Sequence, residues 1–500
     1  MSQSAAPPPP PRRCAWIVAV WLLLTHGAVA ADFEFNPATQ RAYAELMKLR
    51  VSAARRYLSP ELARTNGVAV YLDNFGDVLT LLTTDDRTLY GKLEKRQADR
   101  LDALEALDDR SPWQRFARAE VRLHWAFVKL KFGHEVSACW DVVRAYRLLE
   151  ENRRRFPDFV PTYKSLGALH VLIGSVPTRF AGFVRLMGLK GSVGQGMLEV
   201  QDVARRDTPF RNEARLIELL LKGYVLSFTP EDAARTRALV HEHPDNLMFA
   251  LFGAGLLLKD ARSEEALAVL ENRPQGPDYL PYPFVQHQLG EIQLQKGHYA
   301  AALGHYRAFL GHYNGVNFRK DAHVRQFLCL WLLGRDAQAL AQLRLAQTTG
   351  STGVEADRAA QKLAETFLAK GLSARHKVLF KARFACDGGY FDAALGLLLP
   401  YAEKDFAATD EKAEFQYRKG RIYQKQQKPA AAVPHFERAI ALSEAGQLAF
   451  GALSALQLGY LYREQRNEAR ARQFFEKALQ YDDHEYKTSV DNKARAALAR

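Results

Sequence analysis

Apolar residues recur at helical spacing along most of this 500-residue chain. In the stretch 67–82, one broad face carries Tyr71, Leu72, Phe75, Val78, Leu79 and Leu82. Apolar positions three and four residues apart line one side of a helix. Alternating apolar and polar runs between Asn-Gly or Asp-Gly turns, which would indicate strands, are lacking. The pattern therefore predicts an all-α protein.

Near the N-terminus the spacing predicts one helix from Pro37 to Tyr57, a second over 67–82 and a charged third from Thr88 to Leu107. These three have no common register, so we interpret residues 31–133 as a helical entry region that precedes any repeats.

The C-terminal stretch 415–479 contains one pattern twice. Gly, Tyr, Ala, Phe and Ala follow one another at spacings of three, nine, four and three residues in both copies. The first copy is Gly420, Tyr423, Ala432, Phe436 and Ala439, and the second is Gly459, Tyr462, Ala471, Phe475 and Ala478. Small residues let two antiparallel helices approach, and the aromatic residues fill the wider gaps. A fixed register of this kind predicts stacked helical pairs that share one core.

This pattern resembles the tetratricopeptide repeat, a helix–turn–helix unit of about 34 residues. The resemblance implies an α-α superhelix of antiparallel helix pairs. Gly420 and Gly459 are 39 residues apart, and we expect the excess length over 443–447, between the second helix of one unit and the next unit. We also expect a capping helix over 490–500.

Weaker matches to the pattern divide the rest of the chain. Residues 134–271 read as degenerate repeats, and residues 284–500 as a C-terminal solenoid. Between them, the segment 272–283 holds four prolines in twelve residues. Because proline interrupts helices, we expect a domain boundary there.

The segment 175–190 departs most clearly from simple repetition. It is rich in apolar residues, and the glycines at 188, 191, 194 and 196 follow or overlap its end. A long apolar insertion in a solenoid is either a packed internal plug or an exposed binding element, and we favour the plug. Gly188–Gly191, Gly196 and the stretch 320–334 also faintly resemble bacterial exported repeat proteins related to the eukaryotic inclusion-body-clearance and lipid-droplet-associated repeat family. That resemblance implies a scaffold.

The first thirty residues have the layout of a secretory signal peptide. Arg12 and Arg13 precede an apolar run over 14–24, and the small residues at 28–30 would suit cleavage. Eleven apolar residues are too few to cross a bilayer, which takes about twenty. The sequence therefore predicts an exported, periplasmic or otherwise extracytoplasmic protein. An uncleaved membrane anchor is the alternative.

The mature chain would be basic. The whole sequence has a net charge of +13, and removal of the signal peptide leaves +11. Such a charge favours anionic partners: acidic peptides, anionic lipid headgroups or anionic glycans. Export disfavours nucleic acid. Cys139, Cys329 and Cys386 are too few and too far apart for a disulfide framework, so we expect buried thiols.

Catalytic chemistry finds little support. The glycines at 188–196 do not form a phosphate loop, because Lys190 precedes Gly191 and no strand leads into them. Close helix packing explains them better. His241 and His243 would point about 200° apart on a helix, so they would not share a metal ion. The sequence predicts no catalytic residues, no cofactor and no metal.

Binding by the inner surface of the solenoid is the main expectation. In the register of Gly420 and Gly459, the inward-facing candidates on first helices are Tyr417, Arg421, Lys425, Tyr460 and Arg463. Their cations would bind carboxylates, and their tyrosines would add apolar area. The set only partly resembles the carboxylate clamp of some family members, because the asparagines are missing. For these five residues themselves, ordinary solvated charges are the interpretation that we favour, and binding of a ligand is the alternative.

Two functions follow from these observations. The first is an exported, non-enzymatic scaffold that binds a protein or peptide through its concave surface. The second is an envelope enzyme, or enzyme subunit, with a site in the insertion 175–190. The sequence leaves the identity of the partner and the oligomeric state open.

Overall fold

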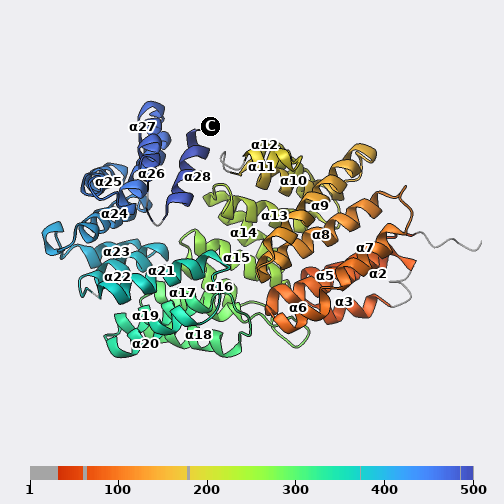
Figure 1. The fold of residues 1–500 in the computed structure, drawn as a ribbon, viewed down its shortest axis with the longest axis horizontal. Helices are drawn as coiled ribbons and strands as arrows, with labels where there is room; N and C mark the ends of the chain where they lie inside the picture. Colours follow the sequence, from red (N-terminus) through yellow and green to blue (C-terminus); the bar gives the residue numbers. More distant parts are fainter. Residues whose placement is uncertain are drawn as a thin grey trace, which may run out of the picture.

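The computed structural model describes residues 32–59, 65–176, 181–371, 373–482, 484 and 486–498. Over these ranges the chain forms helices and loops and contains no strand, so the all-α prediction is confirmed. Helices pack in antiparallel pairs, and successive pairs wind into a superhelix (Figure 1). The predicted signal peptide lies outside the described residues.

The entry region is more divided than the sequence pattern indicates. The predicted helix 37–57 is broken at Leu49, whose φ is 63°, and the predicted helix 88–107 is also two helices. Neither break has a glycine or proline to mark it. The helices up to the first long pair are α2 (Pro37–Met47), α3 (Val51–Tyr57), α5 (Gly67–Thr84), α6 (Arg87–Leu93), α7 (Arg96–Glu105), α8 (Pro112–Phe132) and α9 (Glu135–Arg155).

The middle of the chain continues the superhelix. Asn246 begins a helix here by accepting a hydrogen bond from Phe249 N, a typical N-terminal cap. The helices are α10 (Pro161–Gly174), α11 (Ala181–Leu186), α12 (Val193–Arg205), α13 (Arg211–Tyr224), α14 (Pro230–Glu242), α15 (Leu247–Lys259) and α16 (Ser263–Glu271).

The C-terminal part is the most regular. It contains α17 (Phe284–Gln295), α18 (Tyr299–His312), α19 (Arg319–Leu332), α20 (Asp336–Thr348), α21 (Glu355–Lys370), α22 (His376–Asp387), α23 (Phe391–Leu398), the short 3₁₀ helix η2 (Glu403–Asp405), α24 (Thr409–Lys425), α25 (Pro429–Ser443), α26 (Ala449–Glu464), α27 (Glu468–Leu479) and α28 (Lys487–Leu498). The extra residues between units follow Ser443, and α28 packs on α26 and α27 as a cap. Both features agree with the sequence pattern.

The repeat register has a direct physical cause in these last units. A Cβ added to Gly420 would lie 2.7 Å from Phe436, and one added to Gly459 would lie 2.4 Å from Phe475. Only glycine lets the ring of the second helix reach the backbone of the first. Ala432 and Ala471 are fully buried beside these contacts. The repeated residues therefore lie where the paired helices come closest.

The proline-rich segment 272–283 packs back onto the beginning of the chain. Leu280 N donates to Leu49 O at 2.8 Å, and Arg50 forms an ion pair with Asp278 at 3.3 Å. Tyr279 and Leu280 also pack against the N-terminal hydrophobic core. As expected, this segment interrupts the succession of helices between α16 and α17. The division into two domains there stays a prediction.

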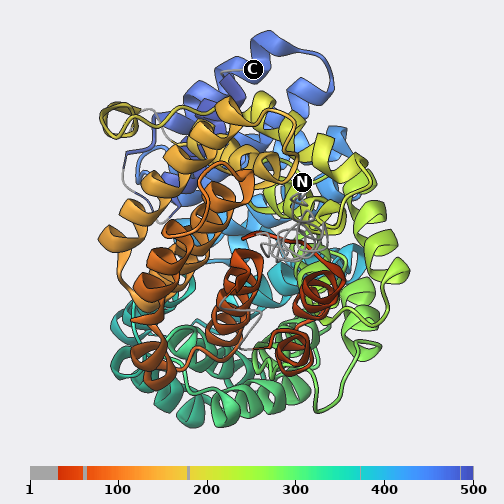
Figure 2. The ribbon, with the colours of Figure 1, turned by 90° about the vertical axis from the view of Figure 1, so that its right-hand side faces the viewer.

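Contacts also join two further parts of the chain that are far apart in sequence. The Tyr313 hydroxyl donates to Asp85 Oδ2, and Asn317 Nδ2 donates to Lys131 O at 2.7 Å. The loop after α18 therefore contacts the C-terminal ends of α5 and α8. Seen from the end where the chain begins, the helices form a ring, with α2 and α3 in red inside its outline (Figure 2).

The insertion 175–190 differs from our expectation. Its described helix α11 lies on the surface, and Leu186 is 82% exposed. A packed plug is therefore the wrong interpretation of this part. The glycines that follow behave as expected: a Cβ on Gly196 would lie 2.4 Å from Gly167 O, and one on Gly191 would lie 2.6 Å from His170 O. Close packing of α10 and α12 requires both.

The cysteines agree only in part with the sequence-based expectation. Cys329 and Cys386 are buried free thiols, whereas Cys139 is exposed on α9. Within the described ranges, no helix combines the length and the apolar character needed to cross a membrane.

Candidate functional site

The inner surface of the N-terminal part is occupied by the chain's own helix α2. Tyr43 of α2 donates a hydrogen bond to Glu213 of α13 at 2.5 Å, and its ring lies 5.0 Å from that of Phe210. At the end of α2, Lys48 forms an ion pair with Asp245 at 2.5 Å. The first turn of the superhelix therefore holds its own ligand-like segment.

Charges beneath α2 are matched by partners. Lys164 on α10 is 1% exposed and donates to Glu120 at 2.6 Å and to Glu213 at 2.9 Å. Ser165 donates to the other oxygen of Glu120. Burial opposes the lysine charge, but the two carboxylates outweigh it and raise the pKa of Lys164. This network joins three helices and pairs Lys164 with two carboxylates of the protein itself.

The inner surface of the C-terminal part is different. Here α15, α24 and α28 bring together four cations, which we call the cationic cluster: Lys259, Arg421, Lys425 and Lys493. In Figure 1, α28 follows the last repeat and turns back toward helices from the middle of the chain. This return brings Lys493 near Arg421 and Lys259. Lys259 and Lys493 are exposed, and Arg421 and Lys425 are half-buried. The cluster is thus within reach of a ligand.

The cations of the cluster act on one another. Burial lowers the pKa of Lys425, and the charge of Arg421 lowers it further. The pKa of Lys493 is lowered by burial and again by Arg421, and that of Lys259 by burial and by Lys493. Although Lys259 and Lys493 are accessible to solvent, the surrounding protein removes part of the water around each ammonium group, which is the main cause of the lowered pKa. Like charges in so confined a place repel one another.

The carboxylates nearest to the cluster do not neutralise it. Asp260 forms an ion pair with Arg262 at 2.8 Å, and Asp387 lies 3.6 Å from Arg383. Glu355, at the start of α21, favours the charged forms of Lys259 and Lys493. Within the described residues, however, none of the four cations has a carboxylate oxygen within 4.0 Å.

The contacts that the cluster does make are neutral. The Arg421 guanidinium donates to Gln424 Oε1 and to Gln457 Oε1, both at 2.6 Å. Lys259 Nζ lies 4.1 Å above the ring of Tyr224, which is 56% exposed. This cation–aromatic contact leaves the charge available, and the tyrosine adds an apolar surface beside it.

The structure brings together only part of the predicted binding set. Arg421 and Lys425 lie in the cluster. Tyr417, by contrast, is 7% exposed and packs between the rings of Phe436 and Phe450, so it does not line the inner surface. On α24, Tyr417 therefore faces α25 and α26, which pack over it.

The remaining two predicted residues lie near the capping helix. Arg463 donates to Ala497 O at 2.9 Å, and its guanidinium lies 4.8 Å from the centre of the Phe475 ring. Tyr460 is partly buried against the same ring. Arg463 therefore attaches α28 to α26. Lys259 and Lys493, which the sequence analysis missed, carry no local signal: each is a single lysine at a helix position that only the tertiary fold brings near Arg421.

In the described part of the chain, no three His, Cys, Asp or Glu side chains gather in a group that could hold a metal ion.

Comparisons with known proteins identify the repeats. The family model of the tetratricopeptide repeat matches residues 413–445 and 453–484, the stretch in which the sequence pattern is plainest. No curated protein matches the chain.

Several solved structures resemble the chain weakly. The TPR domain of P58(IPK) is 13% identical with a TM-score of 0.21, and the alignment covers 85% of this chain and 98% of that one. Human IFIT1, as a dimer with PPP-AAAA, is 14% identical with a TM-score of 0.32 over 90% and 96% of the two chains. Yeast Tom70 is 11% identical with a TM-score of 0.23 over 92% and 88%. Similarities this low carry no argument about function.

Proposed function

We propose that this chain, in which residues 413–445 and 453–484 match the tetratricopeptide repeat, is a non-enzymatic scaffold that binds an acidic segment of a partner protein on the inner surface of its C-terminal part. The observation that carries this proposal is the cationic cluster, whose four cations come from three helices and have no carboxylate partner among the described residues. Protein and peptide partners are the usual ligands of concave repeat surfaces.

Energetics support an anionic ligand. A carboxylate that reaches Lys425 or Lys493 exchanges repulsion among like charges for charge-assisted hydrogen bonds, each worth about 1.5–3 kcal/mol. Burial strengthens this effect, because electrostatic attraction is less screened where water is partly excluded. A segment with several carboxylates would bind best, since the four cations are spread over α15, α24 and α28.

The competing enzyme hypothesis has less support. The insertion 175–190 contains no His, Cys, Asp or Glu, so it offers none of the usual metal ligands, and Lys190 is the one residue in it that commonly acts as an acid or base. Its described helix carries Leu186 on the surface. An apolar residue this exposed fits a contact surface better than a reaction site.

Export belongs to the same proposal. Arg12, Arg13, the apolar run 14–24 and the small residues 28–30 support a cleaved signal peptide. We therefore expect the scaffold and its partner to meet outside the cytoplasm. N-terminal sequencing of the protein purified from its native cells should begin near residue 31. A protein recovered from the cytoplasm with residues 1–30 attached would contradict export.

The binding proposal is tested with two labelled decapeptides, one of glutamate and one of glutamine, in fluorescence anisotropy titrations. The glutamate peptide should bind, and the double variant Lys425→Gln/Lys493→Gln should weaken it by about tenfold or more. A matched control, Lys92→Gln/Lys404→Gln, removes two exposed lysines elsewhere and should keep most of the affinity. Equal weakening by both double variants would reduce the effect to net charge and contradict the proposed site.

A further inference from the structure

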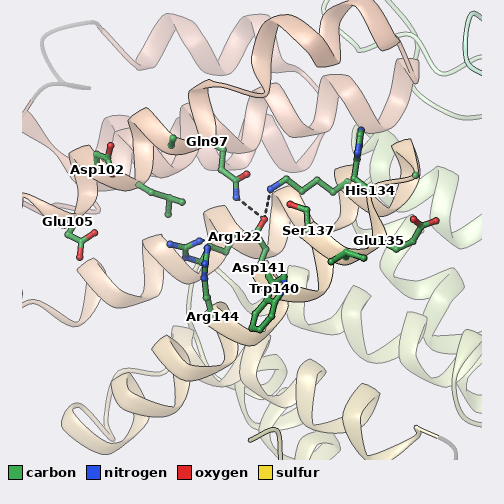
Figure 3. A pocket seen from close by; sticks show the side chains of 15 residues that line it. Gln97, Asp102, Glu105, Arg122, His134, Glu135, Ser137, Trp140, Asp141 and Arg144 are labelled. Carbon is green, nitrogen blue, oxygen red and sulfur yellow. Dashed lines mark hydrogen bonds and ion pairs between the residues drawn. The ribbon is translucent and has the colours of Figure 1, made fainter. Parts of the chain in front are cut away.

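A second groove lies away from the cationic cluster, between α7 and α9, with α8 as its floor. It encloses about 910 Å³ and shares no residue with the cluster. In Figure 3, Asp141 of α9 lies near the centre of the groove, where Gln97 of α7 and the cations of α8 meet it. We call it the α7–α9 groove. Grooves of this size that combine aromatic residues with a few convergent polar groups commonly bind ligands.

The floor of the groove carries an excess of positive charge. The Asp141 carboxylate is 5% exposed and accepts hydrogen bonds from Lys129 at 2.7 Å, Arg122 at 3.1 Å and Gln97 at 3.0 Å. One carboxylate thus faces two cations. Arg144 lies beside Arg122 (Figure 3) and adds a further positive charge.

One donor at this place has no protein partner. Arg122 Nε is buried and forms no hydrogen bond with any described residue. A buried polar group without a partner is unfavourable, so a ligand oxygen that accepted a hydrogen bond from it would gain binding free energy. Burial lowers the pKa of Arg122, and the charge of Arg144 acts in the same direction. Both observations favour an anionic oxygen between the two guanidinium groups.

The wall next to these arginines is apolar. Trp140 on α9 is 48% exposed, and Val136, one turn earlier, is 75% exposed. Trp140 precedes Arg144 by four residues, so the indole and the guanidinium lie on the same face of α9. Exposed tryptophan beside arginine is a typical composition of protein-binding surfaces.

Acidic side chains limit what the groove accepts. Figure 3 shows Asp102 on one side of Asp141 and Glu135 on the other. A run of several acidic residues would meet these carboxylates and be repelled. For a single carboxylate between Arg122 and Arg144, the two guanidinium charges would offset this repulsion.

We propose that the α7–α9 groove binds a partner polypeptide that carries one carboxylate directly beside a large apolar side chain. The carboxylate binds Arg122 and Arg144, and the apolar side chain lies on Trp140. This contact differs from the proposed function of the cationic cluster, which takes acidic runs. A scaffold with both sites would distinguish two segments by the number of their charges.

Trp140 provides the measurement. Trp125 and Trp331 are buried, and the partly buried Trp113 packs against Phe35 and Phe159. Among the described tryptophans, Trp140 alone lines the groove, so an added ligand should change its emission most. The probes are two capped tripeptides, phenylalanyl-glutamyl-glycine and phenylalanyl-glutaminyl-glycine, added to the full chain. The glutamate probe should change the emission saturably, with an affinity about tenfold higher than that of the glutamine probe.

Variants on one helix separate the groove from net charge. Arg144→Gln should weaken the glutamate probe by about tenfold, whereas Arg154→Gln, an exposed arginine farther along α9, should not. The double variant Lys425→Gln/Lys493→Gln should bind this probe as the original chain does, which keeps the result independent of the cationic cluster.

Three results would overturn the inference. The first is equal affinity for the two probes, and the second is equal weakening by Arg144→Gln and Arg154→Gln. The third is an emission change that follows protein concentration without any probe, together with dimers in sedimentation. That outcome would assign the groove to a second copy of this chain.

Discussion

The N-terminal and C-terminal parts of the superhelix build similar inner surfaces and use them differently. In the first, α2 covers the surface, and Lys164 is bound by Glu120 and Glu213. In the second, the cations Lys425 and Lys493 form no ion pair with a carboxylate of the described residues. A buried cation with matched partners stabilises the fold, and an accessible cation without them favours a ligand. The difference shows that the repeat architecture alone does not decide where binding occurs.

Removal of Lys164 should destabilise the protein more than any change to the cationic cluster. Lys164→Met leaves two carboxylates close together and nearly buried, so the free energy of unfolding should fall by about 3–5 kcal/mol. Urea denaturation at neutral pH measures it. The control Lys92→Met changes an exposed lysine in the same part of the chain and should have little effect. A loss below about 1 kcal/mol would mean that the network does not hold the helices together.

A second change tests the regular packing of the C-terminal part. Ala432→Leu adds volume where α25 contacts α24, at a fully buried position. Overpacking should lower the free energy of unfolding by about 1–3 kcal/mol. Ala430→Leu makes the same substitution at an exposed position of the same helix. If both variants unfold alike, the repeat register that we derive from Gly420 and Phe436 is wrong.

Removing cations from the cluster should affect stability least. For Lys425→Gln/Lys493→Gln the free energy of unfolding should not fall by more than about 0.5 kcal/mol, because no carboxylate of the described residues loses an ion-pair partner. A large loss of stability, comparable with that expected for Lys164→Met, would mean that these lysines serve the fold rather than a ligand.

Alkaline pH should separate the two kinds of lysine. The pKa of Lys164 is raised, so its stabilisation is present below the unfolded pKa of about 10.4 and is lost as pH rises through the folded pKa. The pKa values of Lys425 and Lys493 are lowered. Their charged forms therefore oppose folding below those values, and the penalty disappears as pH rises toward about 10.4. Relative to Lys425→Gln/Lys493→Gln, the original chain should gain stability over that range. The absence of any such gain in urea denaturation series would contradict the lowered values.

The helical fold could be predicted because its signals are local. Gly420 and Phe436 lie within one repeat, and their spacing alone indicates a close contact, which the structure shows. The break at Leu49 was missed because a leucine with positive φ has no sequence signature. Tertiary contacts with Leu280 and Asp278 stabilise the chain around it instead.

Of the four cations in the candidate site, two could be predicted from the sequence. Arg421 and Lys425 share one helix with the repeat pattern, so the register identified them. Lys259 and Lys493 join them through the curvature of the whole superhelix and the return of α28, neither of which a single repeat encodes. Tyr417 was assigned to the inner surface because the register places it on a first helix, but Phe436 and Phe450 enclose it.

Proton uptake on binding tests the central claim most directly. If a carboxylate ligand neutralises Lys425 and Lys493, their lowered pKa values must rise toward normal, and the complex must take up protons in the alkaline range between the lowered and the ordinary pKa of lysine. Calorimetric titration of the glutamate decapeptide in two buffers of different ionisation enthalpy gives the number taken up. We expect uptake by the original chain and by Lys92→Gln/Lys404→Gln, and its loss in Lys425→Gln/Lys493→Gln. Binding of the peptide without proton uptake by the original chain would show that the cationic cluster is not the site.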